Sequence, residues 1–377
     1  MREGKQHITG LIPYSVFPAR MGGQKGIALF YRYLGEMTNL NLVVPSVSDR
    51  PNGYPATIFP ILGKGIRRYI NPLLYGRVKK VLKDTSSSVL IIEHPYLGWL
   101  GYLLKKGAHV KLVVHSHNIE SLRFKSTGKW WWGLLWHYER FTHRAADFSF
   151  FVTREDMLFA MKHFKLSSKK CKTITYGFER SSAPSPEERH KAARFIREKH
   201  NIPTYEQVYL FNGTLHYGPN LDALEYILRE INPRLLKERS DYKIIVCGKG
   251  LPDSFENLKG FADRNIIFAG FVDDIEPYFL GSDVFLNPLT DGGGIKTKLV
   301  EALGYNMDAV STKSGAIGVP IEVTGGKLKV AEDKDWETFV KLLISTKNQN
   351  NIPAEFFNHF YWGNIAKEAA GVLSNQL

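Results

Sequence analysis

Cysteine is scarce in this sequence of 377 residues. The two that occur, Cys171 and Cys247, stand 76 positions apart beside strand-like residues, which predicts two buried free thiols in a reducing compartment. Long hydrophobic runs are also missing, since no stretch of 18 or more uncharged apolar residues is present that would span a membrane as a helix. The first fifteen residues lack the apolar core of a secretory signal. We therefore expect a cytoplasmic protein.

Patterns typical of bound metal ions are missing as well. No group of cysteines and histidines has the spacing of metal ligands. The single Asp-x-Asp triplet, Asp333–Lys334–Asp335, stands directly before a helical pattern, so that Asp335 is expected to cap that helix. The sequence therefore predicts a protein with no metal site and no cofactor.

Positive charge is abundant but uneven. The chain carries 50 Lys and Arg against 37 Asp and Glu, a net charge of +13. Residues 1–180 hold 28 of the basic and 11 of the acidic residues, whereas the remainder is slightly acidic. A basic half indicates an anionic partner, for which nucleic acid, anionic lipid and a diphosphate-linked substrate all fit. Because no helix-turn-helix or RNA-binding motif is present, we expect no nucleic acid.

Short apolar runs alternate with amphipathic stretches, a pattern typical of βαβ units in parallel sheets. The first half contains five predicted strands, at 7–15, 39–46, 87–94, 109–116 and 147–153, and two predicted helices, at 24–37 and 70–82. A stretch of serine, alanine and proline at 181–186 predicts a linker. A charged helix is expected after it, at 187–200.

The alternation then begins again. Five more strands are predicted, at 208–213, 242–250, 265–271, 282–289 and 307–312, with helices at 220–236, near 275–282 and at 295–304. The expected fold class is α/β, with two Rossmann-like domains that face each other across a cleft. Their expected ranges are 1–180 and 187–354. Ligands of such sheets bind at the carboxyl ends of the strands.

The segment FLNPLTDGGGIKTKLVEALGYN, residues 285–306, is the most informative. After a predicted strand come Gly292, Gly293 and Gly294, which let the backbone approach a ligand closely. A helix is expected to begin near Ile295, and its start offers unpaired N–H groups and partial positive charge. The segment is therefore a candidate anion site.

Two lysines in the expected first turn of that helix strengthen this interpretation. The helix dipole disfavours Lys296 and Lys298 there by about 0.3–1 kcal/mol each, and a bound diphosphate would remove the conflict. Glu301 lies three residues after Lys298 on about the same face and could accept hydrogen bonds from ribose hydroxyls. The alternative is an exposed helix with scattered charges after a glycine turn.

The N-terminal half offers two further candidates. Loop 13–26 places Gly22–Gly23 just before the first helix, where an anion could bind, although a plain flexible loop is the alternative. His117, Asn118 and Glu120 lie just past a strand end, where active-site groups gather. His117 suits proton transfer or hydrogen bonding to sugar hydroxyls. The alternatives are a histidine bonded to the neighbouring backbone and a glutamate that caps the next helix.

Several segments, in order, resemble the retaining glycosyltransferases of family 4 (glycosyl transferases group 1), which have the GT-B fold. The similar segments are GGGIKTKLVEAL (292–303), FNGTLHYGPNLDALEYI (211–227), FAGFVDDIEPYFLGSDVFLNPL (268–289), ITYGFE (174–179) and VVHSHNIESLRF (113–124). Tyr176 replaces an asparagine of the family pattern, and His115 replaces an aspartate.

The resemblance implies transfer of a sugar, of hexosyl type, from a UDP- or GDP-linked donor to a glycan or lipid-linked acceptor, with retention, as in polysaccharide biosynthesis. It implies catalytic roles for His117, Lys298 and Glu301, and an acceptor side at His117, Asn118 and Glu120. The residues expected at the donor are Gly22, Gly23, Gly213, Gly292, Gly293, Gly294, Ile295, Lys296, Lys298 and Glu301.

The expected reaction needs no metal ion. Lys296, Lys298 and helix N-termini would neutralise the leaving diphosphate. The last segment, 355–377, resembles the helix that crosses back to the first domain in this architecture.

One departure leaves other functions open. Many relatives carry two glutamates eight positions apart here, and Gly293 stands in the place of the first. The contact of that glutamate with the donor sugar would have to come from elsewhere, for example from backbone N–H groups of Gly293 and Gly294. The alternatives are a catalytically inactive protein that binds sugar nucleotides and a sugar-nucleotide epimerase of the same fold.

The segment KWWWGLLWHYERF, residues 129–141, concentrates tryptophan among basic residues. It indicates either an interfacial helix on a membrane or an aromatic helix packed in the core. A peripheral position at the inner face of the membrane is therefore a second expectation for the basic N-terminal half. Its further basic residues are Arg67, Arg68, Arg77, Lys79, Lys80, Lys125, Lys129 and Arg140.

Overall fold

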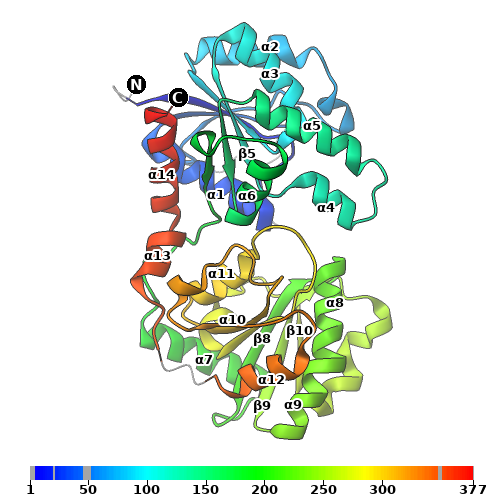
Figure 1. Ribbon diagram of the computed structural model, residues 1–377. Coiled ribbons are helices and arrows are strands. Elements are labelled where there is room, and N and C mark those ends of the chain that lie inside the picture. Colours follow the sequence, from blue (N-terminus) through cyan, green and yellow to red (C-terminus); the bar gives the residue numbers. More distant parts are fainter. Residues whose placement is uncertain (1–4, 20–21, 46–51, 347–349, 377) are drawn as a thin grey trace. The chain divides into compact units, whose positions relative to one another are not determined.

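The computed structural model of the chain describes residues 5–19, 22–45, 52–346 and 350–376 (Figure 1). It contains two compact units, one formed by Met1–Gly177 with Phe360–Leu377 and the other by Phe178–His359. Each unit is built around one parallel sheet covered by helices. The expected α/β fold class with two Rossmann-like domains is confirmed.

The sheet of the first unit has, within the described residues, seven parallel strands in the order β3-β2-β1-β4-β5-β6-β7. These strands are β1 (His7–Leu11), β2 (Asn39–Val43), β3 (Thr57–Phe59), β4 (Val89–Glu93), β5 (Lys111–Ser116), β6 (Phe148–Phe151) and β7 (Cys171–Thr173). The central strands β1, β4 and β5 are buried almost throughout, as expected for a parallel sheet covered on both faces.

The helices of the first unit include the last helix of the chain. They are α1 (Gly22–Met37), α2 (Leu74–Asp84), α3 (Gly98–Ala108), α4 (Glu120–Ser126), α5 (Trp132–Ala145), α6 (Arg154–His163) and α14 (Trp362–Asn375). Short 3-10 turns are η1 (Ile66–Tyr69), η2 (Pro95–Leu97) and η3 (Ser168–Lys170). α14 packs against α1, and the Gln6 side chain donates a hydrogen bond to the Leu373 carbonyl oxygen at 3.0 Å.

The second unit has, in its described part, a six-stranded parallel sheet in the order β10-β9-β8-β11-β12-β13. Its strands are β8 (Gln207–Thr214), β9 (Tyr242–Lys249), β10 (Ile266–Gly270), β11 (Val284–Asn287), β12 (Asp308–Thr312) and β13 (Leu328–Ala331). Its helices are α7 (Pro186–His200), α8 (Gly218–Tyr226), the π-helical turn η4 (Ile227–Ile231), α9 (Asn232–Glu238), η5 (Asp253–Arg264), α10 (Glu276–Gly281), α11 (Thr297–Gly304), η6 (Ile321–Thr324), α12 (Trp336–Ile344) and α13 (Ala354–Phe360).

Every strand predicted from an apolar run is present, and its observed ends lie inside the predicted range or one residue beyond it. Three strands were not predicted: β3, β7 and β13. They have only three or four residues and lie at sheet edges. A run that short shows no recognisable periodicity, which is why the sequence pattern missed them.

Several helix starts differ from the prediction. α1 begins at Gly22, so Gly22–Gly23 are its first residues and do not precede it. α2 begins at Leu74 and not at 70. α11 begins at Thr297, two residues after the expected Ile295, because Lys296 has an extended backbone (φ −89°, ψ 93°) and is the N-cap.

Two caps follow the expected chemistry. The Asp335 carboxylate accepts a hydrogen bond from the Thr338 N–H at 3.0 Å and caps α12, as predicted. At α7 the Ser185 hydroxyl accepts from the Glu188 N–H, and the Glu188 carboxylate accepts from the Ser185 N–H. The predicted linker 181–186 therefore ends in this capping box, with Pro186 already helical.

Close packing of α1 depends on a glycine. A Cβ at Gly35 would overlap the carbonyl oxygen of Pro55, a backbone atom that cannot rotate away. We therefore expect Gly35→Ala to lower the free energy of unfolding by about 1–3 kcal/mol, measured by urea unfolding with far-UV circular dichroism. The control is Gly371→Ala in α14, where nothing lies within 4 Å and the higher helix propensity of alanine should be neutral or stabilising. Equal effects of the two substitutions would contradict the packing argument.

Candidate active site

The glycine-rich loop follows β11 in the second unit. Gly292 and Gly294 have φ of 97° and 70°, left-handed values that favour glycine. The Lys296 ammonium folds back and donates hydrogen bonds to the carbonyl oxygens of both, at 3.0 Å for Gly294. Gly293 is exposed, and Ile295 is half-buried. The loop is thus closed around Lys296, whose ammonium binds backbone carbonyls of the loop itself.

Lys298 connects this loop to the neighbouring strand. Its Nζ donates a hydrogen bond to the carbonyl oxygen of Asn212 in β8 at 2.8 Å, and Gly213 follows in the same strand. The loop also approaches the start of α8, since a Cβ at Gly292 would lie 3.8 Å from the Pro219 ring. The structure therefore brings together the glycine loop, Lys298, Gly213 and the beginnings of α8 and α11.

Lys298 brings a buried ammonium group to this edge. Burial lowers the pKa of Lys298 to about 8, although the charge of Glu301 acts in the opposite direction. The N-cap residues of α8 and α11, Tyr217 and Lys296, make no side-chain capping hydrogen bond. The side-chain oxygen of Asn212 is buried and has no hydrogen-bond partner within the part of the chain that the structure describes. Two helix starts and one ammonium group in this arrangement favour an anion.

In the first unit, a buried carboxylate lies at the carboxyl end of β4. Glu93 ends this strand and is paired in register with His115 of β5. Its Oε1 lies 3.0 Å from His115 Nδ1, and its Oε2 lies 2.6 Å from His117 Nε2. Burial would raise the pKa of Glu93, but the close contacts with His115 and His117 outweigh it and hold this pKa well below its usual range. Glu93 is therefore an ionised group inside the protein.

A second buried carboxylate lies beside the first. Glu120 accepts hydrogen bonds from Arg123 and, at 2.5 Å, from the Tyr96 hydroxyl, and its Oε1 lies 2.9 Å from Nδ1 of His94. His94 Nε2 in turn lies 2.8 Å from the Tyr14 hydroxyl. Burial opposes the ionisation of Glu120, yet these partners hold its pKa well below the usual range.

The two networks share a stack of rings. The His94 ring lies 4.7 Å from the His117 ring and 5.4 Å from the Tyr96 ring, and it is nearly parallel to both. His94 also has a φ of 59°, a left-handed value that is uncommon outside glycine. Such strain at a strand end is found at functional sites.

Two of the alternatives raised by the sequence are wrong. His117 is bonded to a carboxylate and not to the backbone. Glu120 is the first residue of α4 and not its cap. The backbone N–H groups of Glu120 and Ser121 are instead bound by the Glu139 carboxylate, at 2.8 and 2.9 Å, and burial raises the pKa of Glu139 to about 7.

Asn118 contributes mainly to the turn between β5 and α4. Its carbonyl oxygen accepts a hydrogen bond from the Ser116 hydroxyl at 2.8 Å, and its amide reaches Glu120 at 3.4 Å. Five members of these networks were not predicted from the sequence. The one indication in the sequence was that the apolar run 87–94 ends in two ionisable residues, Glu93 and His94. The five are Tyr14, Glu93, His94, Tyr96 and Arg123.

One atom from each of Glu93, His115 and His117 lies within 4.8 Å of the others, a grouping that sequence spacing did not reveal. Such a donor set would suit a divalent transition metal. However, each carboxylate oxygen pairs with a different imidazole nitrogen at hydrogen-bonding distance. Hydrogen bonding therefore accounts for the cluster, and the absence of a metal from the reaction stays a prediction.

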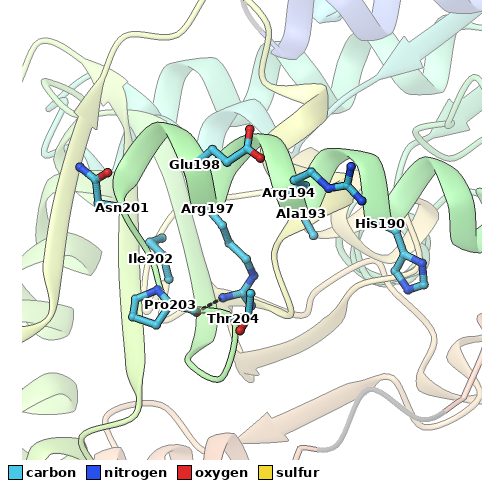
Figure 2. A pocket seen from close by; sticks show the side chains of 9 residues that line it. All are labelled: His190, Ala193, Arg194, Arg197, Glu198, Asn201, Ile202, Pro203 and Thr204. Atoms are coloured by element: carbon cyan, nitrogen blue, oxygen red, sulfur yellow. Dashed lines mark hydrogen bonds between the residues drawn. The ribbon is translucent and has the colours of Figure 1, made fainter.

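A hollow of about 590 Å³ on the second unit is separate from these groups. Figure 2 shows its lining residues along α7 and the loop that follows. That loop leads into the amino end of β8, the opposite end of the strand from Gly213. Arg197 in this hollow donates to the carbonyl oxygens of Pro203 and Glu206, at 2.6 and 2.9 Å, and so holds the loop.

Two family models match the chain. Residues 22–181 match the family described as Glycosyltransferase Family 4, and residues 206–346 match Glycosyl transferases group 1. A Klebsiella pneumoniae protein described as "Uncharacterized 44.6 kDa protein in cps region" is 28% identical over 158 residues. This match spans 40% of the chain and 40% of that curated relative.

Solved structures share the fold over nearly the whole chain. Sucrose-phosphate synthase (tll1590) from Thermosynechococcus elongatus has a TM-score of 0.73 and 12% identity, with 98% of each chain covered. Alr3699/HepE from Anabaena, solved in complex with UDP, has a TM-score of 0.70 and 15% identity, with 98% of this chain and 100% of that chain covered. Since both halves match glycosyltransferase families and the fold agrees throughout, the chain belongs to the glycosyltransferases of the GT-B fold.

Proposed function

We propose that this chain transfers a sugar, as a hexosyltransferase, from a nucleotide-diphosphate sugar to a glycan or lipid-linked acceptor, with retention and without a metal ion. The observation that carries the proposal is Lys298, whose ammonium reaches β8 beside the glycine loop and two helix starts. Preorganised positive charge of this kind neutralises a leaving diphosphate where no divalent ion is used. The complex of Alr3699/HepE with UDP supports UDP as the nucleotide.

The other candidate residues take supporting roles in this proposal. Glu301 binds the ribose, and backbone N–H groups of the glycine loop bind the donor diphosphate. The assignment of Gly22–Gly23 to the donor stays a prediction from the sequence. His117 lines the sugar or acceptor site, on the first unit. Attack from the front face, assisted by the leaving phosphate, accounts for retention, and a glycosyl-enzyme adduct detected by mass spectrometry would refute this part.

Nucleotide binding is the first experiment. Unfolding temperatures are measured with UDP, GDP and ADP, with and without Mg²⁺, for the wild type and Lys298→Ala. A ligand at about 100 times its Kd stabilises by about 2.7 kcal/mol, which is a readily visible shift. We expect one nucleotide to act, independently of Mg²⁺, and the mutant to lose the effect. No shift with any nucleotide would contradict the proposed donor site.

The lowered pKa of Lys298 predicts a pH dependence of binding. A diphosphate binds the charged ammonium, which loses its proton as pH rises through about 8. The Kd of UDP should therefore be constant below pH 8 and rise above it, toward tenfold per pH unit, with proton uptake on binding. Isothermal titration calorimetry between pH 7 and 9.5 measures both.

The matched control is Lys298→Arg, because a guanidinium stays charged throughout this range. Its UDP affinity should not change between pH 7 and 9.5. If the UDP affinity of the wild type were equally independent of pH, Lys298 would not be the group that binds the diphosphate.

Two alternative functions predict different products. An epimerase would convert the sugar nucleotide with no acceptor present, which chromatography of a donor-only reaction detects. A binding protein without activity would not hydrolyse the donor even slowly. We expect slow hydrolysis that Lys298→Ala abolishes.

We further propose that the first unit rests on an anionic membrane surface through the segment around η1. Ile66, Ile70 and Leu73 are 81%, 79% and 67% exposed, and Arg67 and Arg68 stand between them. Apolar side chains flanked by arginines suit the boundary between headgroups and acyl chains. No helix in the described ranges is long and apolar enough to cross a membrane.

The tryptophans of segment 129–141 differ in burial, so that one fits a packed core helix and another fits a membrane contact. Trp136 packs against Phe164 at 5.7 Å in a small core cluster. Trp130, just before α5, is 84% exposed. It is a second apolar contact for the same surface in our proposal.

Vesicle sedimentation at low salt tests this contact. The triple substitution Ile66→Ser, Ile70→Ser and Leu73→Ser should reduce binding to anionic vesicles at least tenfold, since burial of each such side chain contributes about 1.5–3 kcal/mol. Phe271→Ser, at a 65% exposed site of the second unit, is the control and should bind normally. Failure of the wild type to sediment would rule out the membrane contact.

A further inference from the structure

Glu93 constrains the protons of the two histidines that bind it. The ionised carboxylate has no hydrogen to give, so each imidazole nitrogen that faces it must carry one. Tyr31 is a further neighbour of Glu93. Its burial and the negative charge of Glu93 hold the pKa of the Tyr31 hydroxyl well above the usual range, so Tyr31 stays a neutral phenol. His115 is therefore protonated at Nδ1, and His117 is protonated at Nε2.

The remaining nitrogens of these two rings have different surroundings. Nε2 of His115 is buried with no hydrogen-bond partner among the described residues, so a second proton there would be an unsatisfied donor. The His117 side chain is 17% exposed, and no residue in the described part of the chain bonds its Nδ1. His117 thus presents an open lone pair.

His94 shows the contrasting arrangement. Glu120 binds its Nδ1 and the Tyr14 hydroxyl meets its Nε2, so both nitrogens are used within the protein. The centroid of the His94 ring lies 4.7 Å from that of the His117 ring. The centroid of the His115 ring lies 4.6 Å from that of His117. The stacked rings restrict rotation of His117. Of the three, His117 has the most exposed side chain and also a nitrogen that no described residue bonds, whereas the unbonded Nε2 of His115 is buried.

We propose that Glu93 is a positioning residue that holds His117 as the Nε2–H tautomer, so that Nδ1 accepts a hydrogen bond from a substrate hydroxyl. The hydroxyl belongs to a sugar substrate, and this part rests on the proposed function. The tautomer itself does not, because the protein alone sets it. A carboxylate behind a histidine fixes ring orientation and tautomer in other sites by the same physics.

The tautomer is measured by ¹⁵N NMR of histidine-labelled protein at pH 8 without ligand, with His117 assigned by its loss in His117→Ala. We expect Nε2 of His117 to carry the proton and Nδ1 to show the shift of a bare nitrogen. Glu93→Gln keeps the shape but offers one carbonyl and one NH₂, so it should disturb this pattern. Glu155→Gln, an exposed glutamate of the same unit, is the control. An Nδ1–H or averaged tautomer in the wild type overturns the proposal, even if Glu93→Gln does not fold.

The consequence for activity is measured with the sugar nucleotide that raises the unfolding temperature, by its rate of hydrolysis. Glu93→Gln should lower kcat about 10–100-fold with nucleotide affinity unchanged, whereas Lys298→Ala should lose affinity. A wild-type rate in Glu93→Gln with an altered tautomer would overturn the positioning role. Failure of every nucleotide to bind would instead count against the proposed donor site, and the tautomer result would stand by itself.

Discussion

The burial of two carboxylates at the carboxyl edge of the first sheet is the constraint on which this half of the molecule depends. Glu93 and Glu120 have almost no exposed surface, and an unpaired charge there would be prohibitively costly. Each is ionised only because imidazole, phenol or guanidinium groups from separate segments reach it. The need to satisfy these two groups thus orients three histidines and connects the ends of β4 and β5 to α4.

The second unit buries a positively charged group, the ammonium of Lys298. Lys298 is held by a backbone carbonyl of β8, and burial makes its ammonium easier to deprotonate. A carbonyl dipole compensates less than a carboxylate does, so the site keeps its capacity for an anion. The two units therefore bury different ionisable groups: the first surrounds two carboxylates with imidazoles, and the second holds an ammonium group beside the glycine loop.

Much of this architecture follows from local pattern. Apolar runs predicted every long strand, because a parallel sheet covered on both faces demands continuous hydrophobic residues. The glycine loop was recognisable because Gly292 and Gly294 adopt conformations that favour glycine. Helix starts were less accurate, since the extended backbone of Lys296 moved the start of α11 by two residues. The short edge strands β3, β7 and β13 left no signal at all.

The sequence by itself determined the fold class and identified the glycine loop and His117 as candidates, because each is encoded by residues close together in the chain. Only the tertiary structure decided which groups His117 contacts. Its partner Glu93 lies 24 residues away and becomes its neighbour through the pairing of β4 with β5. The same holds for Lys298 and Asn212, which are 86 residues apart. Protonation and charge depend on burial and on such distant partners, and neither can be derived from local spacing.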